Sequence, residues 1–435
     1  MVVITDLTTD GQGHRLPVVP LPSFSPFLPE EKTMLTPRQI ELIKATVPVL
    51  REHGVALTTH FYKRMLSGNP EVKNLFNQAH QAKGHQQRAL ASAVLAYAEN
   101  IEDPTPLLPA VRHIAVKHCT IGVRAEQYGV VGKHLLASIR EVLGEAATNE
   151  LVDAWAAAYN QLADILIGAE SNIYKEQAMA EGGWSGWRPF RVVRREDSGS
   201  GVVSFYLAPS DGGRLPEFKP GQFVSVRAFI KELGLSQPRQ YTLSSCEGGT
   251  MIRISVKREC PEGAPKGAMS NHLHDNLQEG DVIEVSAPLG DFVLNDGDNT
   301  VVLFSAGIGI TPMASMLEAL ARKESRRPVR FIHVARNSQS FPLMSEIEAN
   351  ISRLPDARLQ VFYTKPLEGD ALRCCCVGRP CGESLKKLGI PADADVYLCG
   401  PTAFMEEQRK ALQECGIPAS QIHHEVFGTG EMAGS

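Results

Sequence analysis

One histidine, His118 in the segment IAVKHCTIGV, has neighbours that place it on the buried face of a helix. Counting back from it, apolar residues occur at Ile114, Val111 and Leu107, which is the period of an apolar helix stripe. An inward-facing imidazole is a common metal ligand, but a core histidine with satisfied hydrogen bonds would show the same pattern. Taken by itself, this segment leaves both interpretations open.

Two strand-to-helix turns near the end of the chain have the composition of a dinucleotide site. In LFSAGIGITPM, Gly307 and Gly309 follow an apolar strand pattern, where small residues let backbone N–H groups approach a pyrophosphate. Thr311 and Pro312 predict the start of the following helix, as its N-cap and first-turn residue. A ligand-free turn would read the same, but YLCGPTAFM repeats the arrangement, and two such turns on one parallel sheet favour nucleotide binding. The predicted contacts are Gly307, Ile308, Gly309, Ile310, Thr311, Pro312, Cys399 and Gly400.

The segment PRQYTLSS carries side chains suited to a phosphorylated flat ring. Arg239 offers a planar donor fork, Tyr241 an aromatic face and Thr242 a hydroxyl group. Downstream, KGAMSNHLHDNL places Gly267 and Ser270 at a predicted helix start, a second anion site. The alternative is that Tyr241 is a half-buried strand residue and Arg239 a surface charge.

Four cysteines gather in RCCCVGRPC, at positions 374, 375, 376 and 381. Adjacent cysteines do not easily converge on one tetrahedral zinc, and the C-x-x-C spacing is absent. We therefore expect a thiol-rich loop from Cys374 to Cys381 rather than a metal site.

These residues fall in three segments that differ in hydrophobic periodicity and in the spacing of turn residues, and this difference predicts a multidomain fold. Residues 1–35 form a proline-rich leader expected to be extended or disordered. Residues 36–180 show helical periodicity throughout and predict an all-α domain. Residues 181–298 contain short strands bounded by turn residues, typical of an antiparallel β-barrel. Residues 299–435 alternate buried strands with helices, which indicates an α/β domain with a parallel sheet.

Composition excludes several classes of protein. A net charge of −5 argues against nucleic-acid binding, and no apolar run approaches the length of a membrane span. The start of the chain lacks the pattern of a signal or transit peptide, so a cytoplasmic location is expected. Nine cysteines in 435 residues do not suggest a disulfide framework.

The strings R-Q-Y-T, G-x-x-S-N-x-L-H, G-I-G-I-T-P, C-G-P and HHEVFG occur in the order found in the ferredoxin–NADP reductase family. With the helical domain in front, the chain resembles flavohaemoglobins, the nitric oxide dioxygenases, from about residue 35 to residue 429. The resemblance implies a globin haem domain, an FAD-binding barrel and an NAD(P)-binding domain. The implied cofactors are haem b, FAD, and NADH or NADPH.

The resemblance assigns His118 as the proximal ligand of the haem iron, with Tyr128 and Glu170 behind it. A carboxylate that accepts the second N–H of the imidazole raises ligand basicity and fixes the ring. A more electron-rich axial ligand favours oxygen activation over reversible oxygen carriage. The resemblance therefore favours a haem ligand over a core histidine as the role of His118.

On the opposite haem face the family pattern falls on Tyr62 and Gln86, which can donate hydrogen bonds to bound dioxygen. The register favours Gln86 over its neighbour Gln87, and His85 falls one residue off that register. The further haem contacts implied are Phe76 and Leu90.

On the flavin side, the resemblance also implies roles for the last strand, where relatives often read E-C-F-G-P and this chain reads E-V-F-G-T. The departure puts the flavin potential in question. Lys117, beside the iron ligand, and Glu425, near the flavin, are expected to tune the potential difference between the two centres. The implied flavin contacts are Phe223, Arg239, Gln240, Tyr241, Thr242, Glu425, Val426, Phe427, Gly428 and Thr429.

The activity implied is that of an NAD(P)H-dependent nitric oxide dioxygenase, which converts nitric oxide and dioxygen to nitrate. Electrons pass from nicotinamide to FAD and then singly to haem iron. Two alternatives stay open, an alkylhydroperoxide reductase and a haem-based gas or redox sensor. The leader could also dock a protein partner with an aromatic-lined groove.

Overall fold

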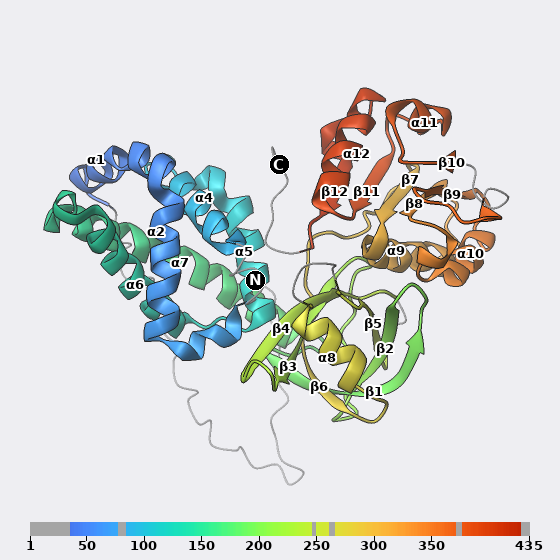
Figure 1. The fold of residues 1–435 in the computed structure, drawn as a ribbon, viewed down its shortest axis with the longest axis horizontal. Coiled ribbons are helices and arrows are strands. Elements are labelled where there is room, and N and C mark those ends of the chain that lie inside the picture. Colours follow the sequence, from blue (N-terminus) through green and yellow to red (C-terminus); the bar gives the residue numbers. More distant parts are fainter. Residues whose placement is uncertain (1–34, 77–83, 246–248, 261–265, 371–375, 428–435) are drawn as a thin grey trace, which may run out of the picture. The chain divides into compact units, whose positions relative to one another are not determined.

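The computed structural model describes residues 35–76, 84–245, 249–260, 266–370 and 376–427 (Figure 1). The predicted leader, Cys374, Cys375, Gly428 and Thr429 lie outside the described residues, apart from Leu35 at the end of the leader. The boundaries proposed above for the three domains stay predictions, whereas the three architectures can be compared with the structure.

The first domain is all-α, as predicted. Its first helix begins where the sequence indicated, because Thr36 and Gln39 form a reciprocal capping box and Pro37 occupies the first helical position. Its elements are α1 (Pro37–Ala45), α2 (Val47–Gly68), η1 (Pro70–Leu75), α4 (His85–Glu99), η2 (Thr105–Leu107), α5 (Leu108–Ile121), α6 (Ala125–Leu143), η3 (Gly144–Ala146) and α7 (Asn149–Met179).

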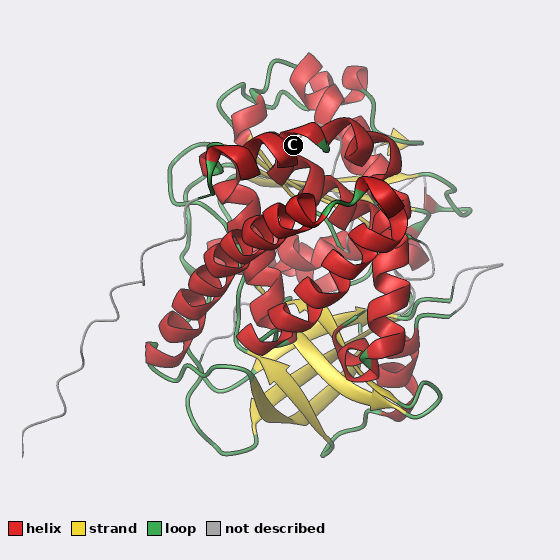
Figure 2. Cartoon of the chain, turned by 90° about the vertical axis from the view of Figure 1, so that its left-hand side faces the viewer, coloured by secondary structure: helices red, strands yellow, loops and turns green. Residues whose placement is uncertain are grey.

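Two helix pairings in this domain position the candidate site. Helix α2 packs against α4 and α6, and α5 packs against α7. Figure 2 shows the helices of the chain in red, and α7 has 31 residues. Phe61, Met65 and Trp155 are buried in the shared core. The α5–α7 pairing brings together His118 and Glu170, which are 52 residues apart in the sequence.

The second domain is an antiparallel barrel with strand order β4-β3-β6-β1-β2-β5. An isolated bridge between Leu243 and Ile254 joins its two edges, which closes the sheet. Helix α8 packs against β3, β4 and β5. The elements are β1 (Trp187–Asp197), β2 (Val202–Pro209), β3 (Phe223–Ile230), β4 (Leu235–Thr242), β5 (Ile252–Lys257), α8 (Ala268–Asn276) and β6 (Val282–Ser286).

The third domain has a parallel sheet with strand order β10-β9-β8-β7-β11-β12. The order reverses direction between β7 and β11, and ligands of such sheets bind in the crevice at that switch point. Its elements are β7 (Val301–Ala306), η4 (Gly307–Gly309), α9 (Ile310–Arg322), β8 (Val329–Ala335), η5 (Ser338–Ser340), α10 (Met344–Ser352), β9 (Ala357–Tyr363), β10 (Cys376–Val377), α11 (Gly382–Lys387), β11 (Asp395–Cys399), α12 (Thr402–Glu414), η7 (Ala419–Gln421) and β12 (Ile422–Glu425).

The predicted fold class is therefore confirmed, with one local correction. Thr311 is not the N-cap of α9, because the chain enters a 3-10 turn directly after β7 and the helix begins at Ile310, with Gly309 as its N-cap. Thr311 Oγ1 instead donates to the carbonyl of Ile308 at 3.1 Å. Within the described residues, no helix combines the length and apolarity needed to cross a membrane.

Candidate functional site

His118 lies on α5 and is held from behind by two side chains. Its Nδ1 lies 2.7 Å from Glu170 Oε1 on α7 and 3.1 Å from the Tyr128 hydroxyl on α6. The Tyr128 hydroxyl donates to the same Glu170 oxygen at 2.5 Å. Three helices thus supply one side chain each to a closed hydrogen-bonded triad.

The electrostatics of the triad orient the imidazole. Glu170 is only 3% exposed, so its carboxylate depends on these two partners. Burial, then the hydrogen bond to Glu170, raises the pKa of the Tyr128 hydroxyl far above its usual range, so it remains a donor. With Nδ1 engaged, the other ring nitrogen of His118 has no hydrogen-bond partner among the described residues, and the side chain is 32% exposed. His118 therefore presents a free, oriented nitrogen.

Tyr62 lies on α2 with its ring packed edge-on against Phe61 and Phe76, at centroid distances of 5.0 and 5.6 Å. Burial raises the pKa of the Tyr62 hydroxyl well above its usual range, which keeps it protonated. The hydroxyl makes no hydrogen bond to any described side chain or backbone group, although the residue is only 9% exposed. A buried donor without a partner is typical of a site for a polar ligand.

Gln86 and Leu90 lie one turn apart on α4, with Leu90 packed against the core that contains Tyr62. The Gln86 side-chain oxygen is buried and has no hydrogen-bond partner in the part of the chain that the structure describes. His85, the first residue of α4, is exposed. The Gln86 side chain is therefore half-buried, with an amide whose oxygen is unsatisfied among the described residues and which a polar ligand could meet.

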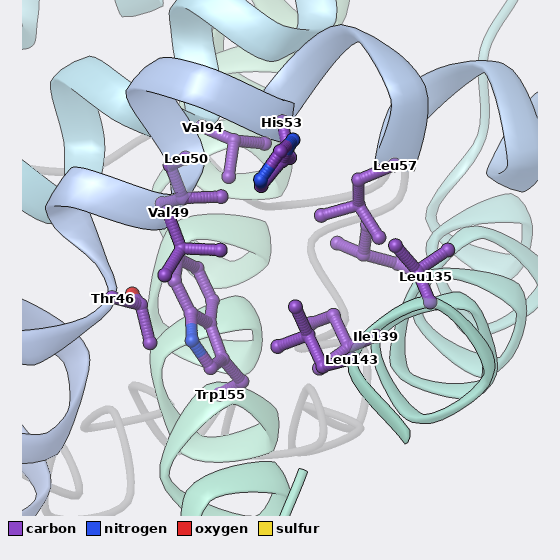
Figure 3. A pocket seen from close by; sticks show the side chains of 11 residues that line it. Thr46, Val49, Leu50, His53, Leu57, Val94, Leu135, Ile139, Leu143 and Trp155 are labelled. Carbon is purple, nitrogen blue, oxygen red and sulfur yellow. The ribbon is translucent and has the colours of Figure 1, made fainter. Parts of the chain in front are cut away.

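An apolar cavity of about 20 Å³ lies elsewhere in the same domain, between α2, α4, α6 and α7 (Figure 3). Its walls are almost entirely hydrocarbon, so it gives a water molecule too few partners to bind. None of the predicted haem contacts lines it. Its lining residues are Thr46, Val49, Leu50, His53, Leu57, Val94, Leu135, Ile139, Val142, Leu143 and Trp155.

In the barrel, the predicted flavin contacts gather on one strand pair. Strands β3 and β4 pair so that Phe223 stands opposite Thr242, with Tyr241 and Arg239 further along β4. Burial lowers the pKa of the Arg239 guanidinium. The Arg239 guanidinium donates to the Pro238 carbonyl at 2.6 Å and to Gln237 Oε1 at 3.3 Å. An anion bound at this strand would offset the cost of burying the charge.

The second predicted anion site lies at the start of α8. Gly267 is the N-cap residue, and a Cβ placed there would come within 2.7 Å of Ser270 Oγ. Ser270 Oγ donates to the Gly267 carbonyl and accepts from the Glu259 N–H, both at 3.2 Å. The hydroxyl is therefore already used in holding the turn, and the backbone N–H groups of the first turn are the groups available to an anion.

A cavity of about 320 Å³ brings Lys117, Phe223 and Glu425 together. Burial raises the pKa of Glu425 to about 7, while Lys117 opposes the rise and Asp291 adds to it. The complete lining is His113, Val116, Lys117, Phe223, Gly290, Asp291, Phe292, Ile422, His423, His424 and Glu425. Of the neighbouring predicted contacts, Val426 is half-buried and Phe427 is 45% exposed.

Several residues at this site were not identified from the sequence. Thr120, two residues after His118, accepts a hydrogen bond from Gln240 Nε2 at 2.9 Å. Arg112 pairs with Asp291 at 3.3 Å. These contacts join segments far apart in sequence, and no local pattern marks either partner. Gln240 therefore contacts helix α5 rather than serving only the barrel.

The two glycine turns of the third domain lie against each other. Gly307 has a φ of +54°, a left-handed conformation that favours glycine. A Cβ on Gly309 would approach the Cys399 carbonyl oxygen to 2.3 Å, and one on Gly400 would meet Ala306 at 3.1 Å. The prediction that both turns lie at the carboxyl edge of one sheet is confirmed, and they flank its switch point.

Of the thiol-rich segment, Cys376 begins β10 and Cys381 is the N-cap of α11. Cys374 and Cys375 lie outside the described residues. Cys381 is exposed, and the hydrogen bonds from Ser384 lower its thiol pKa.

Comparison with protein families matches the three segments separately. Residues 59–166 match the globin family, residues 190–294 the oxidoreductase FAD-binding domain and residues 303–410 the oxidoreductase NAD-binding domain.

Whole-chain relatives extend this likeness. A flavohemoprotein of Bordetella parapertussis is 53% identical over 404 residues, which covers 92% of this chain and 100% of the relative. A flavohemoprotein of Rhizobium meliloti is 46% identical over 398 residues, with coverage of 91% and 98%.

Two solved structures are also similar. The crystal structure of a flavohemoglobin from Malassezia yamatoensis with bound FAD and heme has a TM-score of 0.78 and 32% identity, and covers 91% of this chain and 100% of that one. The FAD/NAD-binding domain of nitric oxide dioxygenase from Vibrio cholerae O1 biovar El Tor has a TM-score of 0.52 and 33% identity, and covers 55% of this chain and 98% of that one.

Proposed function

Because this chain belongs to the flavohaemoprotein family, we propose that it is an NAD(P)H-dependent nitric oxide dioxygenase. Its globin, FAD-binding and NAD-binding domains make it an oxidoreductase that uses haem, FAD and a nicotinamide dinucleotide. When bound, FAD would link the two-electron nicotinamide to the one-electron haem, and the haem would supply the site at which nitric oxide and dioxygen combine to nitrate.

The observation that carries the proposal is the triad of His118, Tyr128 and Glu170. Its geometry fits an iron ligand, since a carboxylate holds Nδ1 and the other ring nitrogen would be left to bind iron. The Glu170 charge increases the basicity of the imidazole, which favours oxygen activation over oxygen carriage. Tyr128 restrains the carboxylate, so the ring keeps one orientation.

On the opposite side, Tyr62 and Gln86 are suited to hold dioxygen. The protonated Tyr62 hydroxyl is a donor, and the Gln86 side-chain amide, whose oxygen has no partner among the described residues, carries an NH2 group as a second donor. A donor in a dry pocket stabilises the partial negative charge that develops on reduced oxygen. Phe76 and Leu90 supply the apolar surroundings that keep water out.

In the reductase part, Tyr241, Thr242 and Phe223 are assigned to the flavin ring, and Arg239 to its phosphates. Gly267 and Ser270 offer the first turn of α8 to the same pyrophosphate. Gly307–Pro312, Cys399 and Gly400 are assigned to the nicotinamide dinucleotide at the switch point. Lys117 and Glu425 share a cavity with Phe223, so their charges act on the region between the flavin strand and the His118 helix. Val426, Phe427, Gly428 and Thr429 stay predicted flavin contacts.

The test is nitric oxide consumption by the haem- and FAD-loaded protein with NAD(P)H in aerated buffer. We expect one nitrate for each nitric oxide consumed and one NAD(P)H for every two. Nitrite as the main product, or consumption that does not need reduced nicotinamide, would contradict the proposal. Turnover of cumene hydroperoxide in place of nitric oxide would instead support an alkylhydroperoxide reductase.

A further inference from the structure

Two basic side chains stand at the carboxyl ends of neighbouring strands in the third domain. Arg336 follows β8 directly, and Lys365 lies two residues after β9. They are adjacent in space, since the Lys365 N–H donates to the Arg336 carbonyl at 2.8 Å. Both side chains are exposed, and neither forms an ion pair or hydrogen bond with a described residue. Two unpaired positive charges thus share one edge of the sheet.

The register of the sheet places these charges beside the glycine turn. Ala306, the last residue of β7, pairs with Val334, and Ala335 pairs with Tyr363. Gly307 and Arg336 are therefore the next residues out from two hydrogen-bonded strands. With strands roughly 4.8 Å apart, their backbones lie within about 10 Å. A dinucleotide bound at the glycine turn could therefore reach Arg336.

In doubly wound sheets this position reads the 2′ substituent of the adenosine ribose. A carboxylate after the second strand accepts a hydrogen bond from a 2′-hydroxyl, whereas an arginine there accommodates a 2′-phosphate. This chain has Arg336 where the acid would stand. A guanidinium matches a phosphate through two parallel hydrogen bonds, and an ammonium group adds a second charge.

The acidic residues near this edge do not neutralise the positive charges of Arg336 and Lys365. Asp370 is 4% exposed, and its Oδ2 accepts the N–H groups of Ser338 at 3.2 Å and Leu367 at 2.8 Å. Its carboxylate therefore braces the two loops and does not face solvent. Glu368, three residues after Lys365, is exposed at the tip of the next turn.

One hydroxyl completes the arrangement. Ser338 stands two residues after Arg336, and its Oγ forms no hydrogen bond within the described residues. The neighbouring Ser340 Oγ is used, since it donates to Asn337 Oδ1 at 2.9 Å. Ser338 is thus an additional donor on the same short turn, η5.

We propose that Arg336, Lys365 and the Ser338 hydroxyl form a subsite for the ribose 2′-phosphate, so that NADPH is the preferred reductant of this chain. The inference rests on the proposed use of a nicotinamide dinucleotide at the switch point. It goes beyond the family assignment, which leaves NADH and NADPH equivalent.

The test compares two adenosine probes that differ only in the 2′-phosphate. Adenosine 2′,5′-bisphosphate and 5′-AMP are titrated calorimetrically into the haem- and FAD-loaded full-length protein. We expect the bisphosphate to bind more tightly, and Arg336→Gln to weaken it about 10- to 100-fold while 5′-AMP is unchanged. Lys365→Gln should weaken it less, because an ammonium group contributes charge without the two-pronged geometry.

Arg358→Gln is the matched control, since Arg358 is an exposed arginine at the amino end of β9, on the opposite edge of the sheet. It should leave both affinities unchanged. Arg336→Glu should reverse the ratio of kcat/KM for NADPH to that for NADH, measured as anaerobic flavin reduction. Equal binding of the two probes by the unmodified protein, or an unchanged ratio in Arg336→Gln, would overturn the inference.

The two proposals fail separately in these assays. Flavin reduction and probe binding do not involve nitric oxide, so a chain that discriminates the probes without forming nitrate would refute the proposed function alone. A chain that forms nitrate but binds both probes equally would refute the subsite alone.

Discussion

At the residue scale, the candidate haem site contains polar atoms that the fold buries or orients without a partner among the described residues. One ring nitrogen of His118, the Tyr62 hydroxyl and the Gln86 amide oxygen are of this kind among the described residues. Unsatisfied buried groups cost on the order of 1–3 kcal/mol each, so a fold retains them where a ligand satisfies them. A ligand that satisfies these groups therefore increases the free energy of unfolding of the helical domain.

Replacing His118 by alanine should remove haem and leave the flavin reductase intact. The imidazole is the proposed iron ligand, whereas the predicted flavin contacts Phe223, Tyr241 and Thr242 lie on β3 and β4. The Soret band measures haem, and ferricyanide reduction driven by reduced nicotinamide measures the reductase. His53→Ala, which changes an exposed histidine on α2, should keep both. Loss of both activities in His118→Ala would show that the domains do not function separately.

Replacing Tyr62 by phenylalanine should weaken oxygen binding by about 1–3 kcal/mol, because one donor to a charged acceptor is lost. The measurement is the oxygen dissociation rate of the ferrous protein, which should rise. Tyr97→Phe is a matched control, since the buried Tyr97 hydroxyl donates instead to the Ala158 carbonyl and to Gln161. An oxygen dissociation rate that is unchanged in Tyr62→Phe would remove Tyr62 from the pocket.

Glu425 should make stability depend on pH. Burial raises its pKa to about 7 in the folded protein, against about 4.3 in an unfolded chain. Between those values the folded protein holds a proton that the unfolded chain has released, so the free energy of unfolding falls as pH rises, and the loss is complete above about 7.

Glu425→Gln lacks this titration. Between pH 5 and pH 8 it should therefore gain about 1–3 kcal/mol of unfolding free energy relative to the unmodified protein, measured by urea denaturation. Glu368→Gln, which changes an exposed acid, should show no such gain. A constant difference across this pH range would mean that Glu425 titrates normally.

At the element scale, strong local patterns were predictable and weak ones were not. The helical period located α5, α6 and α7, and the capping residues Thr36 and Pro37 marked the start of α1. Strand β12, with the sequence IHHE, shows no strand pattern and exists because β11 offers it an edge to pair with. The N-cap of α9 was misassigned to Thr311 because Gly307 and Gly309 allow a 3-10 turn that no propensity rule favours.

The residues of the candidate site also divide into those that the sequence predicted and those that it did not. The resemblance identified the His118 triad, because its members are side chains of distinctive type. Contacts such as that of Gln240 with Thr120 depend on how two distant elements meet, and so they could not be predicted.

The close packing of the two glycine turns predicts that Gly309→Ala damages the nucleotide domain. The added methyl group would collide with the Cys399 carbonyl, which is backbone and cannot rotate away. Overpacking of this kind costs about 1–3 kcal/mol. We expect a lower melting temperature and slower flavin reduction by nicotinamide.

Gly168→Ala provides the contrast for this change. Gly168 lies within α7 with open space around it, so alanine should stabilise the helix by about 1 kcal/mol. Equal melting temperatures for Gly309→Ala and the unmodified protein would show that the two turns are looser than the structure indicates.

At the scale of the whole molecule, the proposed function makes the three architectures consecutive parts of one electron path. In that proposal the parallel sheet binds a nicotinamide at its switch point, the barrel binds a flavin at β3 and β4, and His118 on α5 holds an iron. The cavity shared by Lys117, Phe223 and Glu425 connects the flavin strand with the His118 helix. Fusion fixes the flavin and haem sites at a high effective concentration, so electron transfer needs no diffusional encounter.

The most direct test of this path is anaerobic rapid mixing of the haem- and FAD-loaded protein with NADPH, followed by absorption spectroscopy. We expect that flavin absorbance falls first and that the Soret band then shifts from the ferric to the ferrous position, at a rate independent of protein concentration. Haem that stays ferric while the flavin is fully reduced, or that is reduced only in proportion to protein concentration, would contradict it.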